Sequence, residues 1–182
     1  MSTEIYLSGP AATNYGLFTQ LANSPVITGT TVESTLIDGG LGSLSVPANG
    51  FSIGDTFRGD FGGLMSAKNN DSIRIRIKSG SVILADSGPQ VMPATTNAVW
   101  SLSINFTIRA VGPAGVASIV TLGNFLHIKQ SNGTSEGFAF NTLNNTTFDT
   151  TGLNTLDVTA EWSSTSGLNS IYSDIFTLNK IY

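Results

Sequence analysis

The sequence predicts an all-β protein of β-sandwich or β-barrel type, and three observations support this. Residues 98–112 place Trp100, Leu102, Ile104, Phe106 and Ile108 on one face and polar side chains on the other. Such alternation over nine residues is typical of a strand with one buried face. The same pattern returns in residues 72–80 and 156–164. Turn residues separate these segments at short spacing and none has helical periodicity, which favours a sandwich or barrel.

The composition is compatible with one such domain and indicates an unusual surface. The 182 residues are sufficient for one sandwich with a substantial core. Hydrophobic residues make up 40% of the chain and charged residues only 11%, against about 25% charged in an average protein. The surface must therefore be covered by Ser, Thr, Asn and Gly. Neutral polar surfaces suit assembled or extracellular particles, although a soluble Ser/Thr-rich domain is an alternative interpretation.

Charge argues against a nucleic-acid partner. The net charge is −4 and the isoelectric point is near 4.7, whereas nucleic-acid binders usually carry a basic patch. The nearest candidate is the row Arg74, Arg76 and Lys78 on one strand face. Because the chain has only eight Lys and Arg residues, we expect this row to be a solvated strand face or a subunit contact.

The sequence lacks cysteines, a recognisable signal peptide and a membrane-spanning stretch, and each absence affects what we expect of its chemistry or location. The chain has no cysteine, which excludes disulfides and thiol chemistry. The first ten residues lack the basic and apolar regions of a signal peptide. No apolar stretch approaches the ~20 residues that cross a bilayer. We therefore expect synthesis in a cytoplasm without secretion and no membrane partner.

The first half of the chain contains the following elements. Residues 1–30 are broken by Gly9-Pro10, Pro25 and Gly29, and we expect an arm that packs on the sandwich or on a neighbour. Residues 33–40 and 42–48 are expected to pair with each other around Gly39-Gly40. Residues 55–67 form a long strand. Its three glycines predict bulges or close backbone approach; they are Gly59, Gly62 and Gly63. Residues 72–78 and 81–87 are joined by a tight turn at Ser79-Gly80.

The second half continues with long strands. A loop with Pro89 and Pro93 leads into the strand around Trp100. Residues 115–130 form the next long strand, with a bulge expected at Gly123. A turn-rich tip at 131–137 and a short strand with an Asn/Thr loop follow. The last two strands cover residues 156–164 and 169–182, for a total of eight to ten strands. We expect the final strand to be buried in the sheet or at a trimer axis.

Several segments in this order resemble a known family. They are FRGDFGGLMSA at 57–67, IRIRIKSGSVILADSG at 73–88, Trp100 with FTIRAVG at 106–112, and LDVTAEWSS at 156–164 before the last strand. Together they resemble a β-sandwich domain found in virion structural proteins of tailed bacteriophages and other large DNA viruses. It occurs there in tail or head fibres and in capsid-associated proteins. The resemblance covers residues 31–182.

The resemblance implies a fold, an assembly and a location. It implies a jelly-roll-like antiparallel β-sandwich over residues 31–182, a homotrimer, and a place on the outside of a virion made in the host cytoplasm. Residues 1–30 would then be a capsid or trimer anchor, with Tyr6, Tyr15 and Phe18 as its candidate contacts.

The function that the resemblance implies is structural. We expect a capsid decoration, cement or minor capsid protein that stabilises the particle and binds the major capsid or tail protein. No long fibre stalk is expected, because the first 30 residues lack collagen-like or heptad repeats. The alternative is a host-receptor or carbohydrate-binding fibre-tip module, for which a host surface glycan would be the partner.

One loop is the best candidate for ligand or capsid contact. The polar stretch 141–149 contains the five candidate residues, which are Asn141, Asn144, Asn145, Phe148 and Asp149. Sugar binding needs exposed aromatic rings, and Tyr6, Tyr15 and Phe148 are the candidates for them. Trp100 and Trp162 are instead in phase with apolar neighbours, which predicts that they lie in the core.

Catalytic and metal chemistry are not expected, and no cofactor is implied. The single histidine, His127, is expected at the surface or in an interface, and a triad or a zinc site needs further partners. Asp157 and Glu161 share a strand face but lie about 13 Å apart, beyond either glycosidase geometry. Arg58-Gly59-Asp60 spells an adhesion tripeptide, but it lies inside a strand and is expected to be fortuitous.

Overall fold

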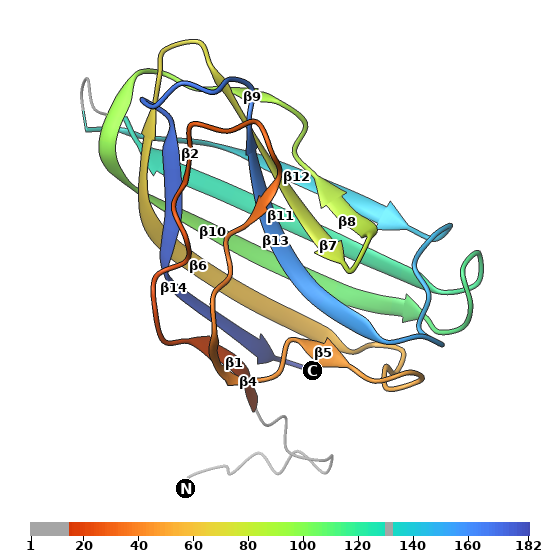
Figure 1. The fold of residues 1–182 in the computed structure, drawn as a ribbon. Coiled ribbons are helices and arrows are strands. Elements are labelled where there is room, and N and C mark those ends of the chain that lie inside the picture. The colour runs from red at the N-terminus through yellow and green to blue at the C-terminus, as the bar shows by residue number, and fades with distance from the viewer. Residues whose placement is uncertain (1–14, 130–132) are drawn as a thin grey trace, which may run out of the picture.

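The computed structural model describes residues 15–129 and 133–182. All of its regular elements are strands, fourteen in number, and all of their pairings are antiparallel. They form two sheets that pack face to face (Figure 1). The prediction of an all-β antiparallel sandwich is confirmed. The fourteen strands exceed the expected eight to ten, because five of them are only two or three residues long; the other nine have at least five residues.

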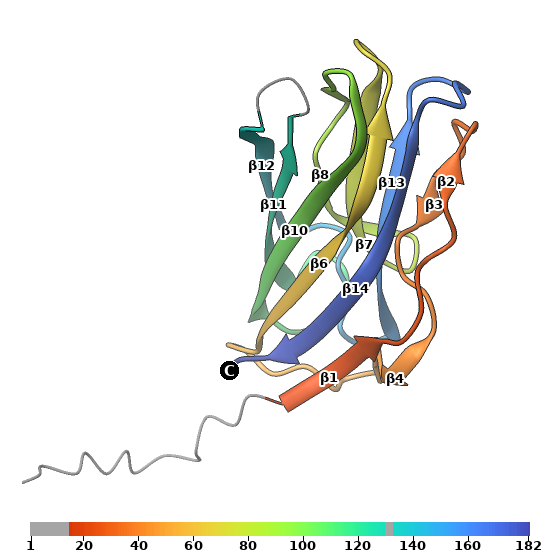
Figure 2. The ribbon, with the colours of Figure 1, turned by 90° about the vertical axis from the view of Figure 1, so that its left-hand side faces the viewer.

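The large sheet contains eight strands. They are β1 (Tyr15–Gln20), β2 (Ile27–Thr28), β4 (Gly40–Gly42), β6 (Thr56–Ala67), β10 (Thr95–Ala110), β11 (Ser118–Ile128), β12 (Ser135–Asn144) and β14 (Ser170–Lys180). Their order is β12-β11-β10-β6-β14-β1-β4, with β2 also paired to β14. Figure 2 looks onto this sheet, with the small sheet behind it. The last strand, β14, is central, as expected for a strand buried in the sheet.

The small sheet contains six strands. They are β3 (Ser34–Thr35), β5 (Ser45–Val46), β7 (Ser72–Ser79), β8 (Val82–Asp86), β9 (Gln90–Val91) and β13 (Asn154–Trp162). Their order is β3-β13-β7-β8, with β5 beside β13 and β9 beside β7. The chain passes from one sheet to the other after β2, β3, β4, β5, β6, β9, β12 and β13.

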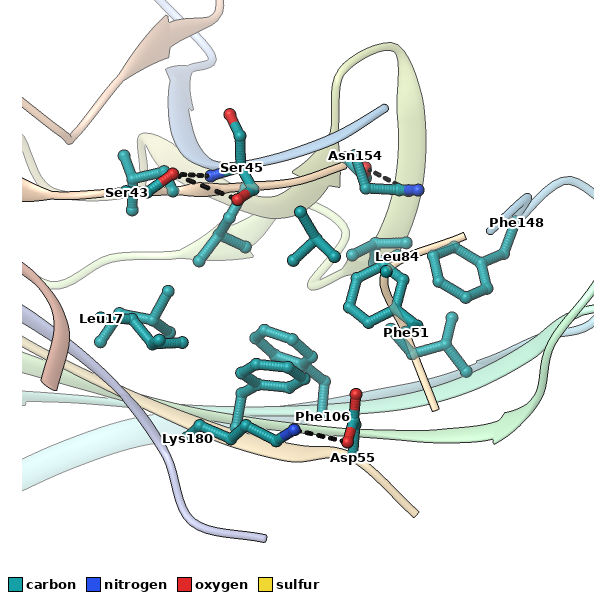
Figure 3. A pocket seen from close by; sticks show the side chains of 18 residues that line it. Leu17, Ser43, Ser45, Phe51, Asp55, Leu84, Phe106, Phe148, Asn154 and Lys180 are labelled. Atoms are coloured by element: carbon teal, nitrogen blue, oxygen red, sulfur yellow. Dashed lines mark hydrogen bonds and ion pairs between the residues drawn. The ribbon is translucent and has the colours of Figure 1, made fainter. Parts of the chain in front are cut away.

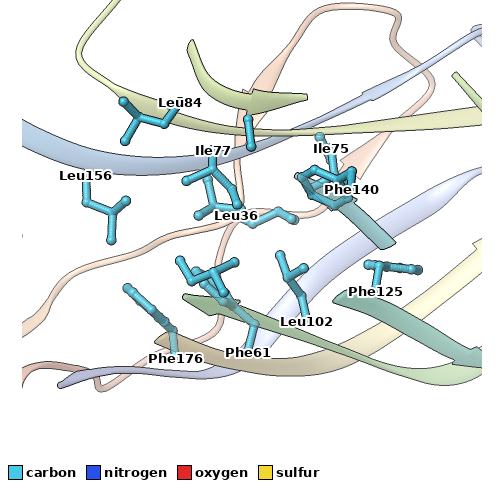
Figure 4. Close-up of a cluster of buried hydrophobic side chains, with 14 of the residues drawn as sticks. Leu36, Phe61, Ile75, Ile77, Leu84, Leu102, Phe125, Phe140, Leu156 and Phe176 are labelled. Carbon is cyan, nitrogen blue, oxygen red and sulfur yellow. The ribbon is translucent and has the colours of Figure 1, made fainter. Parts of the chain in front are cut away.

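The core fills the space between the two inner faces (Figure 4). In β10 every second residue from Ala98 to Ile108 is buried, as its alternation predicts. Trp100 and Trp162 are both buried, which confirms their predicted place. Aromatic rings stack along the large sheet, with centroids 3.9 Å apart for Phe61 and Phe176. Contacts between aromatic rings stabilise a core beyond the area that they bury.

Gly63 in β6 allows a close approach of strand and indole. A Cβ at this position would overlap the carbonyl oxygen of Tyr172 and lie 3.0 Å from the Trp100 Nε1. That indole N–H donates to the carbonyl oxygens of Leu64 (3.2 Å) and Tyr172 (3.0 Å). Opposite this glycine, β14 makes a bulge. The expectation of bulges or close backbone approach in the strand at 55–67 is met here by the close approach, because the extra residue of the bulge belongs to β14 and not to β6.

The predicted boundary at residue 30 is wrong. β1 pairs with both β14 and β4, and β2 pairs with β14, so residues 15–28 belong to the large sheet. Phe18 is buried and packs against Phe176, with ring centroids 5.6 Å apart. The breakers Pro25 and Gly29 interrupt the chain without ending its pairing. Tyr15 begins β1, and Tyr6 lies outside the described residues.

Two other expectations need correction. Residues 33–40 and 42–48 do not pair with each other, because β4 hydrogen-bonds to β1 in one sheet while β3 and β5 hydrogen-bond to β13 in the other. Gly123 causes no bulge, since β11 keeps a continuous register with β10 there. A Cβ at Gly123 would overlap the ring of Phe140, so this glycine makes room for an aromatic side chain. The tight hairpin between β7 and β8 is confirmed, with Gly80 at a φ of 56°.

Candidate functional site

The predicted contact loop is organised by Asn144, the last residue of β12. Its side chain is buried. The Nδ2 donates to the carbonyl oxygen of Ile83 (3.0 Å) and to Oγ1 of Thr147 (2.9 Å). The Oδ1 accepts the backbone N–H groups of Thr146, Thr147 and Phe148. Because every polar atom of this amide is used inside the protein, Asn144 shapes the turn and is not free to bind a ligand.

The other loop residues are divided between core and surface. Phe148 is buried and packs against Phe51, with ring centroids 6.0 Å apart. The expectation of an exposed aromatic platform at Phe148 is therefore wrong, because its ring closes one end of the core. Asn141 and Asn145 are exposed, and Asp149 is half-buried. Hydrogen bonds from Thr151 lower the pKa of Asp149, so this carboxylate is ionised and engaged locally.

The row of basic residues on β7 is neutralised by acidic neighbours on the outer face of the small sheet. Arg76 contacts Glu161 (2.7 Å), Glu33 (2.9 Å) and Asp86 (3.4 Å). The flanking members, Arg74 and Lys78, pair with Asp86 and Glu33. Arg76 is only 8% exposed, so it is not a solvated residue as the sequence suggested. No excess positive charge is left on this face.

Two carboxylates of this network, those of Asp86 and Glu33, are held ionised. The hydrogen bond from Arg74 lowers the pKa of Asp86. Burial raises the pKa of Glu33, but hydrogen bonds from Thr159 and Lys78 and the charge of Arg76 outweigh burial, so its pKa is lower than usual. Opposite charges and donated hydrogen bonds both favour the charged form of a carboxyl group. We therefore expect the network to stay intact at neutral pH.

His127 lies on the inner face of β11 and not at the surface. It lies two residues after Phe125, on the same face of β11, and it pairs with Trp100 of the neighbouring strand β10. The side chain is buried, and no described residue hydrogen-bonds to its Nδ1. The period-two phase with Phe125 was the sequence signal for this position. Burial lowers the pKa of His127.

The buried imidazole predicts a loss of stability in mild acid. An unfolded histidine has a pKa near 6.5, and in the folded protein the pKa is lower. As pH falls below about 6.5, the unfolded chain binds a proton that the folded protein does not, so the free energy of unfolding decreases by at most about 1.4 kcal/mol per pH unit. Urea unfolding between pH 7.5 and 5.5 should show this slope in the wild type and a flatter profile in His127→Gln. Parallel profiles would contradict it. The carboxylates with lowered pKa values change the free energy of unfolding only below about pH 4, which is outside this pH range.

The outer face of the large sheet carries exposed apolar side chains. Val99 is 60%, Ile175 56% and Leu126 42% exposed. The strand register connects them through the half-buried residues Leu64 and Tyr172: Leu64 pairs with both Val99 and Tyr172. Ile175 and Leu126 are connected through a second row of paired residues. Ile175 pairs with Gly62, Gly62 pairs with Ser101, and Ser101 pairs with Leu126. We call this set the outer-face patch; its members are Leu64, Val99, Leu126, Tyr172 and Ile175.

The outer-face patch crosses four neighbouring strands, about 14 Å at the usual strand spacing. It contains no charge. Arg58 and Asp60, further along β6 on the same face, neutralise each other at 2.9 Å, and Asp174 lies at the bulge beside Ile175. The sequence signal for the patch was an apolar residue on the polar side of an alternating strand, as with Val99 beside Trp100.

Asp157 and Glu161, the two carboxylates that share a strand face, are engaged with different partners. Asp157 accepts a hydrogen bond from Thr35 (2.6 Å), while Glu161 is paired with Arg76. Arg58-Gly59-Asp60 lies inside β6, as expected. In residues 15–129 and 133–182, no three His, Cys, Asp or Glu side chains are grouped to hold a metal ion. Across the same residues, no helix has the length and apolar character needed to cross a bilayer.

The comparisons with known proteins do not place the chain in a family. No protein-family model matches it, and no curated protein matches it in sequence. The resemblance to virion structural proteins therefore stays a prediction.

Proposed function

We propose that this protein is a non-catalytic structural subunit that assembles with copies of itself through the outer-face patch. The assembly is a homotrimer on the exterior of a virion, where it acts as a capsid decoration, cement or minor capsid protein and stabilises the particle. Its further partner is the major capsid or tail protein. The virion and the trimer come from the sequence resemblance, whereas the self-contact is argued from the patch.

The outer-face patch is the observation that carries the proposal. Contiguous apolar side chains on the surface of a soluble protein are typical of interaction sites. Each copy has a net charge of −4, so copies repel one another unless they meet where charge is absent. The outer face of the small sheet is unsuitable, because its ion-paired residues would lose water on contact without gaining partners. The neutral patch is the face on which two copies can approach at low electrostatic cost.

The alternative of a glycan-binding fibre tip draws no support from the candidate loop. Carbohydrate recognition depends on exposed aromatic rings that stack on sugar faces, and the loop at 141–149 has one aromatic residue, Phe148, which is buried. Asn141 and Asn145 remain exposed polar groups. Polar side chains of this kind occur on most protein surfaces, so they favour no particular ligand.

The self-assembly is tested by placing charge in the patch. We expect light scattering to give the mass of three 19.0 kDa chains for the wild type and of one chain for Val99→Glu/Ile175→Glu. Both positions are more than half exposed, so the monomer should keep its stability within about 0.5 kcal/mol per substitution.

Leu153→Glu is the matched control. Leu153 is 71% exposed and lies in the loop before β13, away from the patch. This variant should remain trimeric. A monomeric wild type, or a double variant that stays trimeric, would refute assembly through this face.

A further inference from the structure

An apolar cavity of about 210 Å³ lies between the two sheets at the end of the sandwich where β1 and β5 lie. Figure 3 shows Phe106 and Lys180 on one side of it, Leu84 on the other, Leu17 at one end and Phe148 at the other. Most of its wall is hydrocarbon from both sheets, including four phenylalanine rings and seven aliphatic side chains. These are Phe51, Phe57, Phe106 and Phe148, with Leu17, Leu44, Val46, Leu84, Ile119, Leu156 and Leu178.

The polar side chains of the cavity wall are already paired within the protein. Lys180 and Asp55 form an ion pair (2.7 Å), and the second carboxylate oxygen of Asp55 accepts the N–H of Ser52 (2.9 Å). The hydroxyl of Ser79 donates to Asn154 (2.8 Å). A buried ligand that is charged or strongly polar needs a side chain of opposite charge, or a free hydrogen-bonding group, in the cavity wall. The described residues of the wall do not offer one. The ligand that fits is therefore neutral.

The cavity opens along the segment from residue 43 to residue 50. Ser43, Ser45 and Gly50 line the cavity and are exposed. Along this segment Leu44 and Val46 are half-buried, whereas Ser45 points to the outer face of the small sheet, where its hydroxyl pairs with that of the exposed Thr155 (2.9 Å). The site thus has a hydrocarbon interior and an uncharged entrance, at which a polar group can be hydrated.

We propose that this cavity binds a neutral amphipathic molecule, with an unbranched alkyl chain inside and an uncharged polar end that stays in water at the mouth beside residues 43–50. A dry apolar cavity of about 150 Å³ binds benzene, so 210 Å³ has room for a chain of about eight carbons at interior packing density. Ligand binding here is independent of the proposed assembly, because the cavity lies between the sheets and the outer-face patch lies outside them.

Straight-chain alcohols from 1-butanol to 1-decanol test the proposal. Binding is followed by NMR on the methyl groups of Ile119, Leu84 and Leu156, which line the cavity. We expect saturable shifts at these methyls, with affinity rising about fourfold per added methylene. The rise should stop near eight carbons, when the chain fills the cavity. The absence of saturable shifts at these methyls, or an affinity that does not depend on chain length, would overturn the proposal.

A blocking variant gives a second, independent readout. Val46 lines the cavity near its mouth and is half-buried, so Val46→Phe can place a ring in the entrance. We expect it to weaken 1-octanol binding at least tenfold. Val32→Phe, at an exposed position outside the cavity wall, should bind as the wild type does. Equal binding by both variants would refute the site, and if Val46→Phe does not fold, the chain-length series on the wild type decides alone.

Discussion

Replacing Arg76 with methionine is expected to lower the free energy of unfolding by about 3–5 kcal/mol. The guanidinium is almost fully buried and contacts three carboxylates, those of Glu33, Asp86 and Glu161. Methionine keeps much of the aliphatic stem but removes the charge, which leaves the three acids facing one another with Arg74 and Lys78 as the remaining cations. Breaking a buried ion pair costs more than its net contribution, because the partner charges stay desolvated.

Arg58→Met is the control for this change. Arg58 forms one ion pair, with Asp60, and both side chains are close to half exposed. Solvent-exposed pairs contribute about 0–1 kcal/mol, so this variant should unfold almost like the wild type in guanidinium chloride. A loss in Arg76→Met no larger than the loss in Arg58→Met would show that the network on the small sheet does not stabilise the fold. Adding Glu161→Gln to Arg76→Met should recover part of the loss by removing one unpaired carboxylate.

Gly63→Ala is expected to destabilise the protein by about 3 kcal/mol, the upper part of the usual range for overpacking. The added methyl would overlap the Tyr172 carbonyl oxygen, which is backbone of β14 and cannot rotate away. It would also press on the Trp100 indole, whose N–H reaches across β6 to that same oxygen. Relief requires either separating β6 from β14 or displacing the indole. Urea unfolding measures the loss, and a change in tryptophan fluorescence should accompany it.

The neighbouring glycine offers a matched control. A methyl group at Gly62 would point to the outer face and meet a side-chain methyl of Ile175 at 3.2 Å. That side chain is exposed and can move, and replacing glycine with alanine also restricts the unfolded chain. Gly62→Ala should therefore change the free energy of unfolding by less than about 1 kcal/mol. Similar losses in the two alanine variants would contradict the role assigned to Gly63.

The sequence contained most of the information on which residues face inward. Alternation in β10 and β13 located Trp100 and Trp162 in the core, because side-chain direction in a strand depends only on the local backbone. The same rule applied to β11 would have placed His127 inside. Pairing is different, because it depends on residues far apart in the chain. Nothing local indicates that β13 and β14, which are consecutive, lie in different sheets, or that β1 pairs with β14.

Site residues were harder to predict for a related reason. An asparagine in a loop looks the same in sequence whether it binds a ligand or, like Asn144, uses its polar atoms to hold its own turn and to bond to the backbone of β8. Phe148 stood in a polar stretch, and only the packing of Phe51 against it shows that it closes the core. The cavity has no sequence signature at all, since its wall combines side chains from both sheets and from the segment at 43–51.

The central position of β14 has a consequence for biosynthesis. This strand lies between β6 and β1, which are separated from it by more than a hundred residues of chain. Until residues 170–180 leave the ribosome, β6 and β1 have no partner on their facing edges, and Phe176 is missing from the ring stack with Phe18 and Phe61. Unpaired edges beside apolar surface promote association between nascent chains. The chain therefore emerges with its largest sheet open, and a late strand closes it.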